Sequence, residues 1–129
     1  KLEIAVDGKI RIKELTGDGT LVATPAGSTA YNLSAKGPIL NLDSQHLTIT
    51  PISPFRPRVW RGAIVSNKST IVIKNLDSKK RPVSAVADNN EIKNALIVKI
   101  SVNWKIQFKL LYNKKFGLQE RNLAEQFKF

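Results

Sequence analysis

The stretch Gly17–Leu40 (GDGTLVATPAGSTAYNLSAKGPIL) constrains the fold of this chain more than any other segment. It places glycines, hydroxyl residues and one aromatic ring between two apolar, strand-like runs. A glycine-rich turn opens it, Pro25 and Gly27 break the chain again, and a short helix is predicted to begin at Ser28. We expect this order to leave free backbone N–H groups, hydroxyls and the ring of Tyr31 around one spot.

Such a spot suits a nucleotide, because N–H and hydroxyl donors bind phosphate or ribose oxygens and a flat ring packs on a base. Each half of the stretch also has a purely structural interpretation. Tyr31 lies beside Ala30 and Leu33, which is typical of a core aromatic. The segment Gly17-Asp18-Gly19 is equally typical of a simple hairpin connection.

The composition is that of an ordinary globular domain. The chain has 129 residues, of which 42% are hydrophobic and 24% charged, and this length predicts a single domain, 1–129, with a buried core. The absence of cysteine excludes disulfides, thiolate metal sites and thiol catalysis. No apolar run has membrane-spanning length and no signal-peptide pattern is present. We therefore expect a cytoplasmic location and no membrane partner. Because methionine is also absent, we expect the chain to be part of a longer one.

The net charge of +11 arises from 21 basic and 10 acidic residues. Lysines account for 15 of the basic residues and are spread along the whole chain, which favours a solvated basic surface. Only Phe55–Arg61 (FRPRVWR) interleaves arginines with aromatic residues. A small basic β-domain that binds nucleic acid therefore remains an alternative.

Short alternating runs predict a mainly β fold. The clearest is a hairpin in which Asp7-Gly8 joins Leu2–Val6 to the alternating residues that follow. Further strands are predicted at Thr20–Thr24, Leu47–Ile52, Thr70–Lys74, Val83–Ala87, Leu96–Val102 and Lys105–Leu111.

Helices are predicted at Ser28–Ala35, with Ser28 as its N-cap, and at Leu118–Phe127. Turns are predicted at Asp88–Asn90 and at Asn113–Lys115. Together the elements favour a two-layer β-sandwich with one short central helix and one C-terminal helix.

Several kinds of site have no signature here. His46 is the only histidine and has no partner at ligand spacing, so we expect no metal-binding residues and place His46 at the surface or a strand edge. A Gly-x-Ser-x-Gly elbow, a Walker loop and a Gly-x-Gly-x-x-Gly fingerprint are all absent.

The sequence resembles the C-terminal domain of the ATP-dependent NAD kinases (inorganic polyphosphate/ATP-NAD kinases). Five segments carry this resemblance in the family's order: Val6–Gly8, Gly17–Gly19, Thr24–Tyr31, Leu33–Ile39 and Leu47–Ile52. Looser matches follow at Phe55-Arg56-Pro57, Val86–Glu91 and Arg121-Asn122-Leu123. The combination TPxGSTAY and LSAxGP distinguishes this family from lipid and diacylglycerol kinases, which share a general architecture.

The resemblance implies an enzyme that transfers a phosphoryl group from ATP or polyphosphate, with a divalent cation such as Mg²⁺, to the adenosine-ribose 2′-hydroxyl of NAD, giving NADP. It implies that this chain is the NAD-binding and oligomerising domain of a dimer or tetramer. Carried over by motif, Thr29, Ala30, Tyr31 and Ser34 would line the adenosine half of NAD. Asp18 would meet the nicotinamide amide, commonly that of a neighbouring subunit.

Three positions depart from the family pattern. Ala26 replaces a Thr or Ser, so we expect one hydroxyl contact to be missing. Lys36 replaces a glycine, which predicts a negative φ there and places a cation near the ligand. Asn89 replaces the glycine of a DGQ-like turn, which asparagine tolerates because it accepts left-handed geometry.

The family's GGDG motif and its Asn-Glu/Asp pair belong to an N-terminal α/β domain and do not occur in this sequence. GGDG supplies the acid thought to activate the 2′-hydroxyl and to help hold the metal and the ATP phosphates. We therefore expect no catalytic residue in this chain and no NADP formation by the chain alone.

Overall fold

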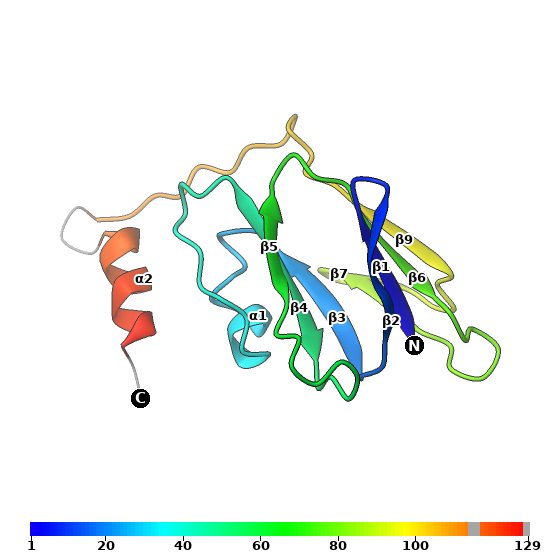
Figure 1. The fold of residues 1–129 in the computed structure, drawn as a ribbon. Coiled ribbons are helices and arrows are strands. Elements are labelled where there is room, and N and C mark those ends of the chain that lie inside the picture. Colours follow the sequence, from blue (N-terminus) through cyan, green and yellow to red (C-terminus); the bar gives the residue numbers. More distant parts are fainter. Residues whose placement is uncertain (114–116, 128–129) are drawn as a thin grey trace. The chain divides into compact units, whose positions relative to one another are not determined.

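A computed structural model describes residues 1–113 and 117–127 and contains, within them, nine strands and two helices (Figure 1). The prediction of a mainly β fold with two helices is confirmed. The chain divides into two compact units. The first comprises residues 1–19, 52–60 and 68–101, and the second comprises 20–51, 61–67 and the residues from 102 onward. Each unit has its own antiparallel sheet, and the packing of two layers stays a prediction.

The first unit is built on a four-stranded sheet in the order β2-β1-β6-β9. Its strands are β1 (Leu2–Val6), β2 (Lys9–Leu15), β6 (Ile71–Asn75) and β9 (Ile97–Ile100). Ile4 lies opposite Ile12 of β2 and Ile73 of β6, while Val6 lies opposite Ile71. Because successive side chains alternate between faces, these pairs gather apolar groups on one side of the sheet, where Ile4 and Ile71 are fully buried.

The hairpin predicted at Asp7-Gly8 is confirmed. Asp7 (φ 51°) and Gly8 (φ 76°) are both left-handed, as the tight turns that match strand twist require. The Asp7 carboxylate also accepts hydrogen bonds from the Ser69 hydroxyl (2.9 Å) and the Thr70 N–H (2.8 Å). Asp7 therefore joins the first hairpin to the residues that begin β6.

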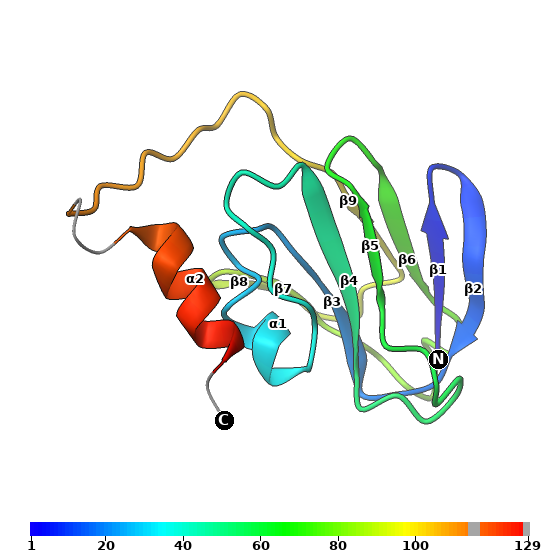
Figure 2. The same cartoon turned by 60° about the vertical axis from the view of Figure 1, so that its left-hand side comes forward.

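A second hairpin, visible in Figure 2, joins β7 (Ala85–Ala87) to β8 (Asn90–Ile92). It confirms the turn predicted after residue 87 and shortens the strand predicted at Val83–Ala87, whereas β8 was not predicted. The left-handed residue of this turn is Asp88 (φ 51°) and not Asn89. Asn89 therefore needs no left-handed conformation in this turn, and its replacement of a glycine causes no backbone strain there.

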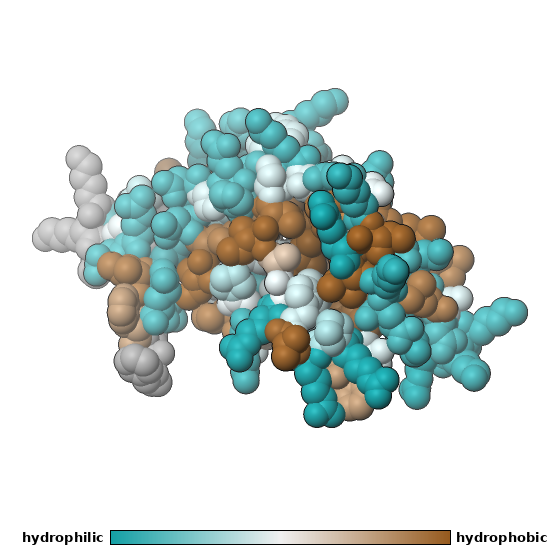
Figure 3. All heavy atoms as spheres, in the orientation of Figure 1, coloured by the Kyte–Doolittle hydropathy of each residue, from teal (hydrophilic) through white to brown (hydrophobic). Residues whose placement is uncertain are grey.

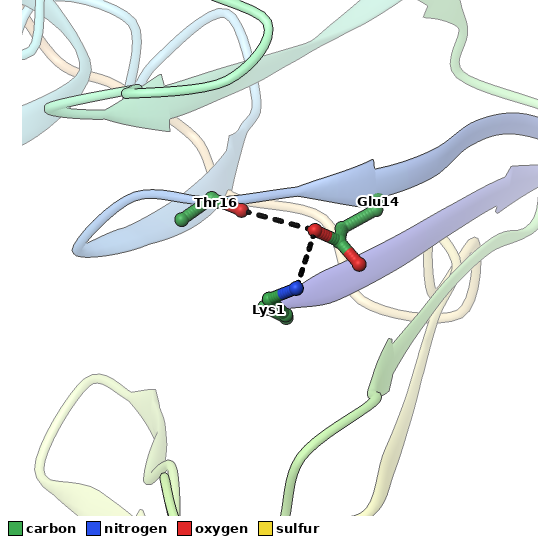
Figure 4. A network of polar contacts seen from close by, with 3 residues as sticks. All are labelled: Lys1, Glu14 and Thr16. Carbon is green, nitrogen blue, oxygen red and sulfur yellow. Dashed lines mark hydrogen bonds and ion pairs between the residues drawn. The ribbon is translucent and has the colours of Figure 1, made fainter.

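A surface ion pair links Lys1 to β2. The Nζ atom of Lys1 lies 2.8 Å from Oε1 of Glu14, and the Thr16 hydroxyl donates to the same oxygen (Figure 4). The hydrogen bond from Lys1 lowers the pKa of the Glu14 carboxyl. A lowered pKa stabilises the folded state above the unfolded-state pKa, and this contribution is lost as the pH falls through the folded-state value. Because both side chains are half exposed, the contribution is small.

The second unit contains a three-stranded sheet in the order β3-β4-β5. Its strands are β3 (Gly19–Ala23), β4 (His46–Ile52) and β5 (Ala63–Ser66), and its helices are α1 (Tyr31–Ser34) and α2 (Leu118–Gln126). The central strand β4 is buried at every residue from Leu47 to Pro51, while His46 is exposed at its start, as expected. Strand β5 was not predicted, because only four residues of weak alternation follow a proline-rich segment.

The helix predicted at Ser28–Ala35 is wrong at its start. Residues 25–30 form turns, α1 begins at Tyr31, and Ser28 is not its N-cap. The Ser28 hydroxyl instead donates to the Pro25 carbonyl (2.7 Å) and accepts from the Leu40 N–H (2.9 Å). This buried hydroxyl is thus satisfied by the turn before the helix and by the loop after it.

The strand predicted at Lys105–Leu111 is also wrong. Residues 102–113 contain no helix or strand (Figure 2), and several of their large apolar side chains are exposed. These are Trp104, Ile106, Phe108, Leu110, Leu111 and Tyr112. Alternation of apolar and polar residues makes a segment suitable for a sheet but does not supply a partner strand. Among the described residues, no strand pairs with residues 105–111.

The helix predicted at Leu118–Phe127 is confirmed to within one residue by α2. Of the turn predicted at Asn113–Lys115, only Asn113 belongs to the described residues. Within the part of the chain that the structure describes, no helix is long and apolar enough to cross a membrane.

Replacing Asp7 by alanine tests the link between the first hairpin and β6. Asp7→Ala removes two hydrogen bonds and a side chain that tolerates positive φ, so we expect the free energy of unfolding to fall by about 2 kcal/mol. The matched control is Asp88→Ala, which alters the same left-handed turn position. Among the described residues the Asp88 side chain makes no hydrogen bond, so this change should cost about half as much. Urea unfolding measures both, and equal losses would contradict the prediction.

Candidate functional site

Four of the five predicted ligand residues lie together on the exposed side of one short segment, Thr29–Ser34. Thr29 is half-buried, Ala30 and Ser34 are exposed, and the side chain of Tyr31 is 62% exposed. The interpretation of Tyr31 as a core aromatic is therefore wrong. An exposed ring on a short helix can pack against a flat ligand such as a base.

Two polar residues of the same stretch, one just before these four and one between Tyr31 and Ser34, face inward. Ser28 and Asn32 are fully buried and hold the segment from beneath. Residues 28–34 thus combine exposed and buried positions, so one set of side chains faces solvent while another fixes the backbone.

The buried Asn32 amide uses all of its hydrogen-bonding capacity. Its Nδ2 atom donates to the Ser28 carbonyl (3.0 Å) and to the Pro38 carbonyl (2.9 Å). Its Oδ1 atom accepts from the hydroxyls of Thr48 (3.0 Å) and Thr50 (2.7 Å), both on β4. Asn32 therefore fixes α1 and the loops on either side of it to the central strand of this unit.

The space around this amide is closed by Gly37. A Cβ atom built there would collide with the side-chain amide of Asn32 and with the Thr50 hydroxyl. The Gly37 N–H also donates to the Asn32 carbonyl (2.8 Å). Glycine is required at this position because no side chain fits.

Sequence reasoning missed these supporting residues, although a signal for them was present. Thr48 and Thr50 alternate with Leu47 and Ile49 in a strand that is buried throughout. Buried hydroxyls need partners, so this pattern predicts a polar group packed against one face of β4. Nothing local identifies that group as Asn32, which lies sixteen residues before Thr48.

The expectation of free backbone N–H groups in this segment is wrong for three residues. The Gly27 N–H donates to the Thr24 hydroxyl (3.3 Å), the Ser28 N–H to the Pro25 carbonyl, and the Ala30 N–H to the Gly27 carbonyl. The turn thus satisfies these three donors itself. Hydroxyl groups and the Tyr31 ring remain as candidate ligand-binding groups.

The expectation of a negative φ at Lys36 is also wrong. Lys36 has a φ of 64°, directly after Ala35, the residue that caps α1. A left-handed residue commonly ends a helix, and glycine is preferred there because it has no Cβ. Here lysine adopts the same conformation.

Asp18, the fifth predicted ligand residue, belongs to the first unit. The simple hairpin interpretation of Gly17-Asp18-Gly19 is wrong, because the strands on either side, β2 and β3, lie in different sheets. The Asp18 N–H donates to the Ile52 carbonyl (3.0 Å). The Asp18 side chain is exposed.

The turn at Asp18 is held by residues 52–56. A Cβ on Gly17 would lie 3.0 Å from the Ile52 carbonyl oxygen, a tight contact that glycine avoids. Thr16 exchanges backbone hydrogen bonds with Arg56, and the Phe55 N–H donates to the Thr16 carbonyl (2.7 Å).

The same loop carries a small cationic and aromatic cluster. The guanidinium groups of Arg56 and Arg58 lie 5.5 Å and 4.8 Å from the centroid of the half-exposed Phe55 ring. This cluster lies within the FRPRVWR segment.

A shallow hollow of about 620 Å³ lies in the second unit, beside loop 39–46 and the end of α2. Its lining includes His46, whose Nδ1 atom lies 3.0 Å from the Ser44 hydroxyl. None of the predicted ligand residues lines it. Among the described residues, no three Asp, Glu, His or Cys side chains are grouped so that they could hold a metal ion.

Comparison with known proteins shows the family of this chain. The family model of the ATP-NAD kinase C-terminal domain matches residues 1–105, and the chain belongs to this family. Curated NAD kinases of Rhizorhabdus wittichii and Rhizobium meliloti are 52% and 54% identical to it over 127 residues, which cover 98% of this chain and 49% of each relative. The chain thus spans about half the length of the curated relatives it matches.

Two solved structures share the fold. An NAD kinase from Archaeoglobus fulgidus in complex with ATP matches with a TM-score of 0.68 and 29% identity, over 78% of this chain and 38% of its own. A yeast NADH kinase complexed with NADH matches with a TM-score of 0.64 and 33% identity, over 77% of this chain and 29% of its own.

Replacing Asn32 by aspartate tests whether its amide holds the segment. Asn32→Asp keeps the shape but places an oxygen against the Ser28 and Pro38 carbonyls, so we expect the free energy of unfolding to fall by at least about 2 kcal/mol. The control is Asn41→Asp, at an exposed position, which should change it by less than about 0.5 kcal/mol. Similar values for both variants in urea unfolding would contradict the prediction.

Proposed function

We propose that this chain is the dinucleotide-binding part of an NAD kinase, which transfers a phosphoryl group from ATP or polyphosphate to the adenosine-ribose 2′-hydroxyl of NAD. Family membership and the names of the relatives support this proposal. So do the titles of the two similar structures, which describe one complex with ATP and one with NADH.

One observation carries the proposal to particular residues: an exposed Tyr31 ring stands on a segment that is fixed by a fully satisfied buried amide. Large apolar rings are normally buried, so an exposed ring on a rigid support points to a ligand. Thr29, Ala30 and Ser34 flank it on the same segment, and hydroxyls suit the ribose oxygens of an adenosine.

For catalysis, we propose that the phosphoryl donor is ATP or polyphosphate and that it acts with a divalent cation such as Mg²⁺. In this proposal the chain supplies no cation ligand and no catalytic residue. We expect these groups to come from an N-terminal α/β domain that carries GGDG, and we expect the chain alone to form no NADP. The part of this chain is to bind and orient the acceptor.

We also propose that the protein works as a homodimer or tetramer, in which Asp18 meets the nicotinamide amide bound to a neighbouring subunit. The exposed Asp18 carboxylate suits this role, since it can accept hydrogen bonds from an amide NH₂. On the face shown in Figure 3, hydrophobic side chains lie exposed between hydrophilic ones. Exposed apolar surface of this kind favours association.

The first test is the activity of the full-length natural polypeptide that carries this chain. We expect it to convert NAD to NADP, and we expect Tyr31→Ala to raise the KM for NAD about tenfold, because base–aromatic stacking contributes roughly 1–3 kcal/mol. The control is Tyr112→Ala, which removes a similarly exposed ring outside the segment and should leave KM unchanged. An enzyme without NAD phosphorylation would refute the proposed function, and equal effects of the two variants would refute the assignment of Tyr31.

Titration calorimetry at two salt concentrations tests the proposal against the nucleic-acid alternative, which no comparison supports. A dinucleotide offers few phosphate contacts, so NAD binding should survive an increase from about 50 to 200 mM salt with a loss of less than tenfold. Binding through many phosphates loses roughly 10³–10⁵-fold over that range. Saturable NAD binding, competed by adenosine, is expected. Binding of single-stranded DNA or RNA in place of NAD would overturn the proposal.

A further inference from the structure

Lys36 adopts a backbone conformation that lysine seldom takes. Its φ of 64° lies in the left-handed region, where the Cβ of any residue other than glycine is crowded by the backbone. Lysine therefore costs folding free energy at a position where glycine would not. A residue held in such a conformation often has a side chain with a functional role.

The backbone around Lys36 is rigid on both sides. The Lys36 N–H donates to the Leu33 carbonyl (2.9 Å), and the next N–H, that of Gly37, donates to the Asn32 carbonyl (2.8 Å). Gly37 is enclosed by Asn32 and Thr50. The Cα of Lys36 is therefore fixed relative to the exposed residues of α1, and it follows Ser34 by only two positions.

The ammonium of Lys36 has no partner within the described residues. Lys36 is exposed, and no ion pair or side-chain hydrogen bond joins its ammonium to another described residue. The sequence from Thr20 to Pro51 contains only two residues that are charged at neutral pH, Lys36 and Asp43. The whole segment that supplies hydroxyls and a ring for a dinucleotide thus has a single cation.

A dinucleotide carries phosphate charges that hydroxyls and a ring do not neutralise. We propose that Lys36 is a phosphate-binding residue of the dinucleotide site, with its ammonium paired to a phosphate group of the ligand. This inference rests on the proposed function. Stabilisation of the helix by a cation at its C-terminal end does not explain Lys36 well, because α1 has only four residues and a correspondingly small dipole.

The phosphate has two possible sources, the pyrophosphate of the dinucleotide and the 2′-phosphate of NADP. Titration calorimetry of the full-length protein with NAD, NADP and adenosine distinguishes them. The variants are Lys36→Gln and Lys36→Gly, which remove the charge, and Lys36→Arg, which keeps it. Lys79→Gln removes the charge of another exposed lysine and is the control.

We expect Lys36→Gln and Lys36→Gly to weaken dinucleotide binding about tenfold, the size of one lost charge-assisted hydrogen bond. Lys36→Arg and Lys79→Gln should bind as the wild type does, and adenosine binding should not change. Lys36→Gly should also raise the melting temperature, because it relieves the left-handed conformation. If Lys36 only stabilised the fold, its replacement by glycine would not weaken dinucleotide binding and raise the melting temperature at the same time.

Equal weakening of NAD and NADP assigns Lys36 to the pyrophosphate, whereas weakening of NADP alone assigns it to the 2′-phosphate. Wild-type affinities for both dinucleotides in Lys36→Gln and Lys36→Gly would overturn the proposal, as would an equal loss of adenosine binding. Absence of dinucleotide binding by the wild-type protein would overturn the proposed function and this inference together.

Discussion

The side-chain amide of Asn32 holds together the part of the chain that carries the candidate site. Its two donors and two acceptors reach a turn, a loop and the central strand β4. A buried amide left with unmade hydrogen bonds is costly, so all four contacts favour one arrangement of α1 and its neighbours. The exposed residues of α1 have defined positions because the buried Asn32 fixes the backbone that carries them.

This arrangement explains why the segment is rich in small residues. Gly37 leaves room for the amide, and Ser28 contributes a hydroxyl that is satisfied on both sides by backbone groups. A larger residue at either place would fill the space that the network occupies. The small residues therefore serve packing, and the proposed ligand-binding groups are the fewer residues that point outward.

Much of the fold could be predicted from alternation and turn chemistry. The hairpin at Asp7-Gly8 and the strand at Leu47–Ile52 were predicted because their signals are local. The start of α1 was misplaced because the Ser28 hydroxyl bonds to Leu40, twelve residues away, instead of to the helix. The strand predicted at Lys105–Leu111 was wrong because its pattern says nothing about which neighbour would pair with it.

The candidate site, like the fold, could be predicted only in part from the sequence. Motif resemblance selected Thr29, Tyr31 and Ser34, but the exposure of Tyr31 and the left-handed conformation of Lys36 were only visible in the structure. Lysine in place of glycine predicts a negative φ from propensity alone. The hydrogen bonds of Leu33 and Asn32 with the residues that follow α1 outweigh that propensity.

The separation of inward-facing from outward-facing residues in α1 has a consequence for how such a domain diverges. Residues that face solvent can be exchanged during evolution with little effect on folding, provided that Asn32 and Gly37 stay in place. Preference for one ligand over another can then drift between lineages while the scaffold remains constant. A homologue in which only Asn32 is replaced should accordingly lose the fold of this segment, whereas one that is changed only beside Tyr31 should keep the fold and differ in the ligand it binds.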